Sequence, residues 1–289
     1  MEESRSNYAA VLPRSLVRAT DIDALPASRE VLRREDYLLV RSPSNPWHYW
    51  GNLLLFDAAP ARGDAERWER CFDAEFAEHP AVRHRTFAWD EPGGELGAVR
   101  EELVPRGYEL EETVGLIAEA GELRAHPRES RAVVVRALDP AGSRDEPLWD
   151  QVMELQIAAR PASFEEAGQR AYARARMADL RELFCGGRGA WYVALDPAGR
   201  DVLGSCGVVT TGARGRYQAV DTIASHRRQG ICSRLLLEAA RLSAAQHGTR
   251  RFVIAADSHY HALGLYESLG FRPVERVAGA YLQPPEDRA

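Results

Sequence analysis

The stretch Arg227-Arg228-Gln229-Gly230-Ile231-Cys232-Ser233 joins two segments whose residue patterns differ. Residues 217–222 are typical of a strand, and the apolar spacing of residues 234–242 predicts a helix. A turn from a strand into a helix directs several backbone N–H groups and the positive end of the helix dipole at one point. Gly230 allows a ligand to approach the backbone, and the arginines offer donors to phosphate oxygens. An ordinary basic turn has the same composition, so a functional interpretation needs support from elsewhere in the chain.

The composition indicates a soluble globular protein of two domains. The 289 residues (32.1 kDa) are 45% hydrophobic and 28% charged. The net charge of −6 argues against nucleic-acid binding, which needs a basic surface. No apolar run approaches the roughly 18 residues of a membrane span, and residues 1–5 lack the apolar core of a signal peptide.

The cysteines give no sign of a metal site. Cys71, Cys185, Cys206 and Cys232 are scattered, without a metal-binding spacing. We therefore expect a cytoplasmic protein with reduced thiols and no metal. Its expected partners include neither nucleic acid nor a membrane, and its expected state is a monomer or a homodimer.

The second half of the chain has a distinctive order of expected elements, β-α-α-β-β-β-α-β-α-β. They occupy residues 132–138, 148–160, 165–184, 190–195, 202–210, 217–222, 234–242, 251–256, 259–269 and 273–282. Glycines at 186–187 and 270 stand where the second and fourth helices should end.

The first half is expected to follow the order β-β-α-β-α-β, after a loose tail over residues 1–30. Its elements occupy residues 37–41, 49–56, 65–77, 84–89, 94–103 and 111–118. Residues 119–129 are polar and rich in turn formers, as is typical of a linker. We therefore expect two domains, over residues 1–125 and 131–289.

Two motifs in the second half resemble those of the GNAT superfamily of N-acetyltransferases. Arg227, Gly230 and Cys232 resemble that family's Arg/Gln-x-x-Gly-x-Gly/Ala loop, with a cysteine in place of the last small residue. Residues 259–271 resemble Asn-x-x-Ala-x-x-Leu-Tyr-x-x-x-Gly-Phe, with His259 in place of the asparagine. The resemblance covers residues 131–282. It implies an α/β protein with a mixed α+β sheet, the GNAT-like acyl-CoA N-acyltransferase fold, in two tandem GNAT-like domains.

The first half is similar in plan but lacks a phosphate loop. Residues 58–64 occupy the corresponding turn, where Pro60 lacks a backbone donor and Asp64 places a negative charge. We expect a degenerate, non-catalytic copy, so that one cofactor binds per chain. An unrelated α+β domain is the alternative.

The resemblance implies transfer of an acetyl group from acetyl-CoA to a primary amine of a small molecule or peptide. The backbone from Arg228 to Ser233 (Arg228, Gln229, Gly230, Ile231, Cys232 and Ser233) would hold the pyrophosphate, with charge added by Arg227 and Arg228. Backbone groups around Asp221, Thr222 and Ile223 would hold the pantetheine arm. His259 would lie near this arm or cap its helix.

The resemblance also implies catalytic roles. Tyr266 is the expected acid for the departing thiolate, against the alternative that it is a packed core residue. Some family members carry a glutamate base on the strand before the loop, and Arg216 occupies that position here. Asp221 is the nearest carboxylate on the strand and the candidate base, acting alone or through water, although a capping role or an ion pair with a nearby arginine explains it at least as well.

Glu165 and Glu166 are candidates for attracting a cationic amine, or else solvated residues at a helix start. Two other functions are compatible with these motifs. In one, the chain is an acyltransferase that uses a different acyl donor. In the other, it binds acyl-CoA as a non-enzymatic sensor or scaffold.

Overall fold

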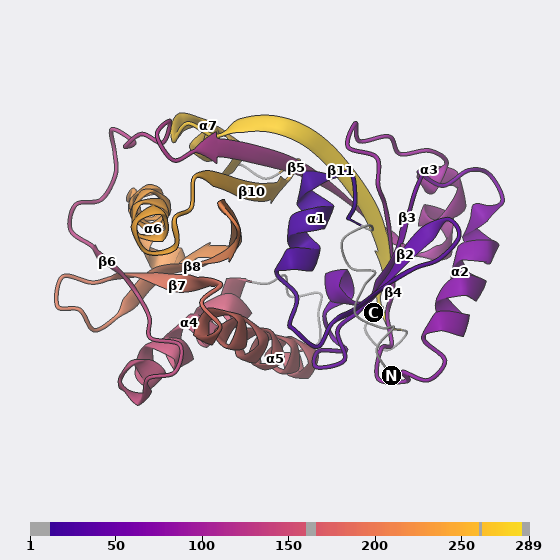
Figure 1. Ribbon diagram of the computed structural model, residues 1–289, viewed down its shortest axis with the longest axis horizontal. Coiled ribbons are helices and arrows are strands. Elements are labelled where there is room, and N and C mark those ends of the chain that lie inside the picture. The colour runs from indigo at the N-terminus through magenta and orange to yellow at the C-terminus, as the bar shows by residue number, and fades with distance from the viewer. Residues whose placement is uncertain (1–11, 160–165, 260–261, 285–289) are drawn as a thin grey trace. The chain divides into compact units, whose positions relative to one another are not determined.

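The computed structural model describes residues 12–159, 166–259 and 262–284 (Figure 1). The chain forms two compact units, Met1–Val114 with Glu275–Ala289, and Gly115–Val274. We expected each domain to be one continuous piece of chain. Instead, strands β5 (Glu109–Glu119) and β11 (Arg272–Leu282) each run from one unit into the other. The cause is the pairing of residues 279–282 of β11 with β4 (Arg85–Trp89) of the first unit.

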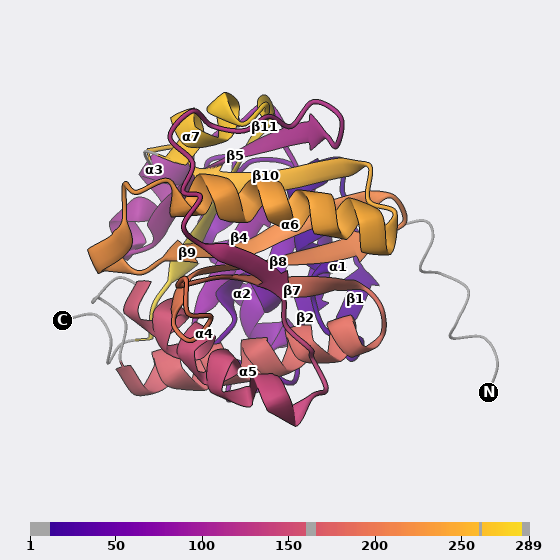
Figure 2. The same cartoon turned by 90° about the vertical axis from the view of Figure 1, so that its left-hand side faces the viewer.

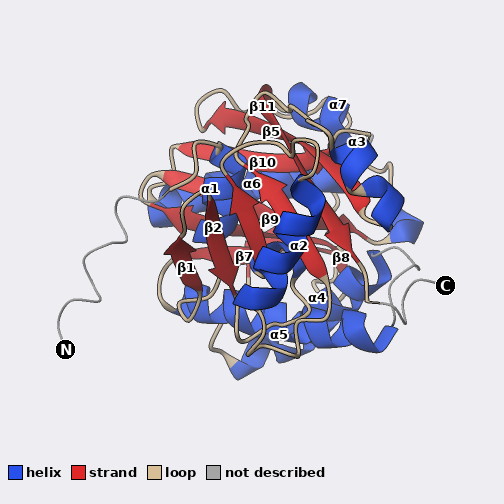
Figure 3. Cartoon of the chain, turned by 90° about the vertical axis from the view of Figure 1, so that its right-hand side faces the viewer, coloured by secondary structure: helices blue, strands red, loops and turns tan. Residues whose placement is uncertain are grey.

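The first unit is a sheet with a helix on each face. Its strands lie in the order β1 (Glu30–Arg33), β2 (Tyr37–Arg41), β3 (Leu53–Phe56), β4 and β11. Because alternate residues of a strand point to opposite faces, the sheet has two apolar surfaces. Helix α2 (Asp64–Glu75) covers one of them (Figure 3). There the ring of Trp68 stacks on that of Phe56, with 3.9 Å between their centroids. Helix α1 (Leu16–Asp23) covers the other, where Ile22 packs with Leu38.

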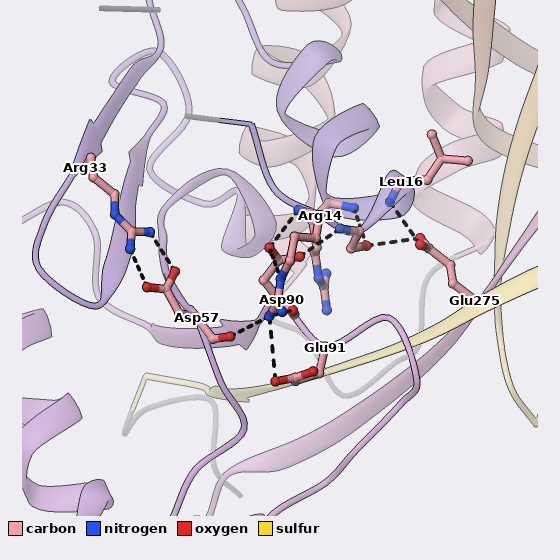
Figure 4. Close-up of polar contacts among 9 residues, drawn as sticks. Arg14, Leu16, Arg33, Asp57, Asp90, Glu91 and Glu275 are labelled. Carbon is pink, nitrogen blue, oxygen red and sulfur yellow. Dashed lines mark hydrogen bonds and ion pairs between the residues drawn. The ribbon is translucent and has the colours of Figure 1, made fainter. Parts of the chain in front are cut away.

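For the described residues 12–30, the sequence interpretation as part of a loose tail is wrong, since they contain α1 and the first residue of β1. The reason lies far away in the sequence. The Glu275 carboxylate accepts hydrogen bonds from the backbone N–H groups of Leu16 (3.0 Å) and Val17, and Asp90 accepts from the N–H of Arg14 at 2.7 Å (Figure 4). The Glu275 carboxylate thus satisfies the first two N–H groups of the helix, and Asp90 holds Arg14 just before the N-cap residue Ser15. The strand expected over residues 49–56 is also shorter in the structure. Tyr49–Gly51 form a 3₁₀ turn, and the strand β3 begins only at Leu53.

The second unit follows the expected order of elements. Its strands lie in the order β5, β10 (Arg251–Asp257), β9 (Arg214–Thr222), β8 (Val202–Thr211), β7 (Gly189–Leu195) and β6 (Val134–Ala137). Helix α6 (Ile231–His247) covers one face, and α4 (Glu146–Ala159) and α5 (Glu166–Cys185) cover the other (Figure 1). Helix α7 (Ala262–Ser268) precedes β11.

Two contacts show how this unit is built. The hydroxyl of Tyr217 on β9 donates to the carbonyl of Leu236 on α6 at 2.7 Å, and Trp149 of α4 packs against Trp191 of β7. The short helix α3 (Val99–Glu102) completes the helices of the described ranges. None of those described helices is both long enough and apolar enough to cross a membrane.

Candidate functional site

Strands β9 and β10 are parallel neighbours that pair only near their beginnings. The pairing joins Arg214–Arg216 to Arg251–Val253, although β9 continues to Thr222 and β10 to Asp257. Backbone groups along the later part of both strands therefore lack the ladder partners that a continuous sheet would supply.

A bulge in β9 accounts for this early separation. Ser205 of β8 pairs with Asp221 and Gly207 with Gln218, so Ala219 and Val220 together lie opposite one residue of β8. Ala219 adopts a φ of +42°, in the left-handed region that side chains disfavour. A bulge bends and twists the strand that carries it, so β9 leaves its parallel neighbour at this point.

The loop after β9 ends in a row of open backbone donors. Gly230 caps α6 with a φ of +76°, and Arg228 is also left-handed at +61°. Within the described part of the chain, the N–H groups of residues 228–233 donate no hydrogen bond, and the first turn of α6 contains no acidic side chain. Free N–H groups at a helix start, together with the dipole, favour an anion.

The side chains of this loop divide into two groups. Arg227 Nε donates to the carbonyl of Thr222 at 3.2 Å, and Gln229 Nε2 donates to the carbonyl of Ser225 at 3.4 Å. The first contact joins the loop to the end of β9, and the second joins two residues within the loop. Arg228 is exposed and makes no polar contact with the described residues. Arg228 is therefore the more available of the two arginines predicted to add charge.

The end of β9 offers fewer backbone groups than the sequence suggested. The N–H of Ile223 donates to the carbonyl of Leu203 of the neighbouring segment at 3.0 Å. Because antiparallel residues alternate in direction, Thr222 turns its backbone groups away from β8. The Ile223 N–H is therefore used by the sheet, whereas the Thr222 carbonyl points away from β8 and accepts from Arg227 Nε.

The candidate acid and base lie on different elements of the second unit. Asp221 is half-buried on β9 at the bulge, and Tyr266 is 6% exposed on α7, with its ring 6.2 Å from that of Phe271. Arg216, at the position of the family's glutamate, is 8% exposed. Its neighbour Gln218 accepts a hydrogen bond from Arg176 of α5 at 3.0 Å. The catalytic roles of Asp221 and Tyr266 stay predictions.

The remaining candidates are only partly described. The backbone N–H of His259 donates to the carboxylate of Asp257 at 2.7 Å, and the His259 side chain is exposed. Glu165 lies outside the described residues. Glu166 begins α5, but its side chain also lies outside what the structure describes. Over the described ranges, no three His, Cys, Asp or Glu residues gather in a way that would hold a metal ion.

Gly230 lies against residues 128–130, a contact that the sequence did not indicate. A Cβ at this position would lie 1.9 Å from the carbonyl oxygen of Arg128, and the N–H of Ser130 donates to the carbonyl of Gly230 at 3.1 Å. The glycine is thus required by a segment of the chain itself. Residues 119–129 were expected to form a linker, and their composition contains no signal for this contact.

The Cys232 thiol, beside the open donors, is expected to be unreactive. Burial and, to a smaller extent, the charge of Asp221 together raise its pKa to about 12. At pH 8 only about one molecule in ten thousand would carry the thiolate that reacts with alkylating agents. With iodoacetamide we expect labelling of the exposed Cys185 and none of Cys232, measured by peptide mass spectrometry. Labelling of both in urea is the control, and rapid labelling of native Cys232 would contradict the prediction.

In this mixed α/β sheet, a bulged strand separates from its parallel neighbour and then leads through a glycine turn into a helix whose first N–H groups are open. Residues 187–273 match the family model described as the acetyltransferase (GNAT) domain. The chain therefore contains a GNAT acetyltransferase domain, and this match spans both the open donors and Tyr266.

Solved structures share the fold of the whole chain. A functionally unknown conserved protein from Staphylococcus epidermidis has a TM-score of 0.67 at 13% identity, covering 89% of this chain and 95% of its own. A GCN5-related N-acetyltransferase from Kribbella flavida has a TM-score of 0.62 at 14% identity, and the alignment covers 93% of this chain and 94% of that protein. A tandem GNAT protein from the clavulanic acid biosynthesis pathway has a TM-score of 0.53 at 16% identity, covering 94% and 90%. A comparison with curated proteins gives no match.

Proposed function

We propose that the second unit transfers an acetyl group from acetyl-CoA to a primary amine of a small molecule or peptide. The observation that carries this proposal is the row of open N–H groups from Arg228 to Ser233, within the segment that matches the GNAT domain. These donors and the exposed Arg228 suit the pyrophosphate of coenzyme A. The unpaired later parts of β9 and β10 suit an extended pantetheine arm, which has amide groups of its own.

The proposed reaction is a direct transfer in a ternary complex. The amine nitrogen attacks the thioester carbon, so a C–N bond forms as the C–S bond breaks. One proton leaves the attacking nitrogen for the Asp221 carboxylate, directly or through a water molecule. The Tyr266 hydroxyl gives a proton to the departing sulfur. An acyl-cysteine intermediate at Cys232 is not proposed, because its raised pKa keeps the thiol protonated.

The first unit is proposed to bind no second cofactor. At the start of α2 the Asp64 carboxylate accepts a hydrogen bond from the N–H of Ala61 at 2.8 Å, so this turn already contains an anion of the chain. Pro60 has no N–H, and its carbonyl accepts from Ala98. A pyrophosphate would meet a carboxylate here rather than free donors.

Titration calorimetry with coenzyme A tests both statements, and we expect one molecule bound per chain. Thiol release from acetyl-CoA with a panel of primary amines and peptides should then identify an acceptor. Asp64→Asn, a substitution in the first unit, should leave the stoichiometry at one. Saturation at two molecules per chain would overturn the single-site proposal. Tight binding without turnover for any amine would favour a sensor, and turnover only with longer acyl donors would favour another transferase.

A further inference from the structure

The segment Glu122–Ser130, between β5 and β6, lies against the start of α6 (Figure 2). We refer to it as the strap. Besides the Arg128 carbonyl next to Gly230, its contacts include the N–H of Ser130, which donates to the Gly230 carbonyl. Both contacts use backbone atoms, so they place the strap relative to the turn without depending on flexible side chains.

The other end of the strap lies against the second motif glycine. A Cβ at Gly270 would lie 2.5 Å from the carbonyl oxygen of Glu122. The N–H of Arg124 donates to the carbonyl of Leu269 at 3.0 Å, and its Nε donates to the carbonyl of Ser268 at 3.2 Å. The strap thus joins the end of α7 to the start of α6, and both anchor points are glycines with positive φ.

A partly buried ion pair joins the strap to α6. Glu129 Oε1 lies 3.3 Å from Arg234 Nη1, and their side chains are 11% and 29% exposed. The same arginine nitrogen lies 3.2 Å from the carboxylate of Glu238, one helical turn further along α6. Arg234 therefore holds two carboxylates, one from the strap and one from its own helix.

The strap supports the turn without using its open donors. Ser130 bonds the carbonyl of Gly230, while the N–H groups of residues 228–233 stay without acceptors in the described structure. A segment that blocked the anion site would have placed carbonyl or carboxylate oxygens on those N–H groups. The observed contacts instead hold the carbonyl side of the turn and leave the N–H groups open.

We propose that the strap positions the anion site and that Glu129 is a positioning residue for coenzyme A. This inference rests on the proposed function of the Arg228–Ser233 backbone. By fixing the left-handed turn at Gly230, the strap holds the donors in one arrangement before the ligand arrives. A preorganised site loses less conformational freedom on binding, so its affinity is higher.

The substitutions Glu129→Gln and Glu238→Gln form a matched pair. Each removes one carboxylate from Arg234 and one negative charge near the start of α6, but only the first loosens the strap. Loss of a nearby negative charge alone would tighten the binding of an anion. We expect the opposite for Glu129→Gln, an increase of about fivefold or more in the Kd of coenzyme A. For Glu238→Gln we expect less than about a twofold change.

Hydrogen exchange of the ligand-free protein supplies a second readout. The amides of Ser130 and Arg234 both donate to the Gly230 carbonyl, so both should exchange faster in Glu129→Gln and not in Glu238→Gln. An unchanged or lower Kd for Glu129→Gln, or unchanged exchange, would overturn the role of the strap. Absence of coenzyme A binding by the wild-type protein would instead overturn the proposed function, and with it the inference.

Discussion

Tyr266→Phe is expected to lower the turnover number for amine acetylation by about 10²- to 10³-fold, with little change in the Kd of acetyl-CoA. The substitution removes the phenolic proton proposed for the leaving sulfur. It keeps the ring that packs near Phe271, so the fold should survive. Steady-state kinetics with an acceptor found in the amine panel, together with calorimetry, gives both quantities.

Tyr217→Phe is the control for this experiment. Tyr217 is also a buried tyrosine of the second unit, 3% exposed, but its hydroxyl bonds the Leu236 carbonyl and has no proposed part in the reaction. Its loss should lower the free energy of unfolding by about 1 kcal/mol and leave turnover near the wild-type value. Undiminished turnover in Tyr266→Phe would rule out Tyr266 as the acid.

Gly230→Ala is expected to raise the Kd of coenzyme A at least about tenfold and to lower the free energy of unfolding by about 2–3 kcal/mol. The new methyl group would meet the Arg128 carbonyl, and the φ of +76° adds backbone strain. Either the strap or the turn must move. Urea unfolding and calorimetry measure the two effects, and circular dichroism checks that the helices remain.

Gly248→Ala provides the comparison at the other end of α6. Gly248 is also left-handed, with a φ of +67°, but a Cβ there would meet nothing within 4 Å. This variant therefore has the backbone strain without the steric clash. We expect its free energy of unfolding to fall by about 1 kcal/mol and its Kd for coenzyme A to stay unchanged. Equal effects of the two substitutions on binding would show that strain alone explains Gly230→Ala.

The sequence was most informative where structure is decided locally. The order of strands and helices in the second unit was predicted correctly, because its apolar spacing and its glycines act over a few residues. The position of the Gly230 turn at the start of α6 followed from the same local pattern. The family match over residues 187–273 includes both predicted motifs up to Phe271.

The sequence was least informative where the local structure depends on contacts with residues far away in the chain. Helix α1 depends on Glu275, more than two hundred positions away, and nothing near Leu16 indicates that contact. The strap depends on backbone approaches to Gly230 and Gly270, which composition cannot reveal. Even inside the predicted site, the bond from the Ile223 N–H to Leu203 follows from the pairing of neighbouring segments rather than from the local residues.

The return of β11 to pair with β4 bears on how the protein is synthesised. A ribosome releases β1 to β4 first, yet their sheet lacks its β11 neighbour until the whole of the second unit has been translated. Until then β4 exposes an unpaired edge, and α1 lacks the carboxylate of Glu275. The second unit, whose residues are contiguous, can complete its core earlier. A fragment cut at the junction near residue 125 would lack residues 275–289 of the first unit, and with them both its closing strand and the Glu275 carboxylate that accepts from the first N–H groups of α1.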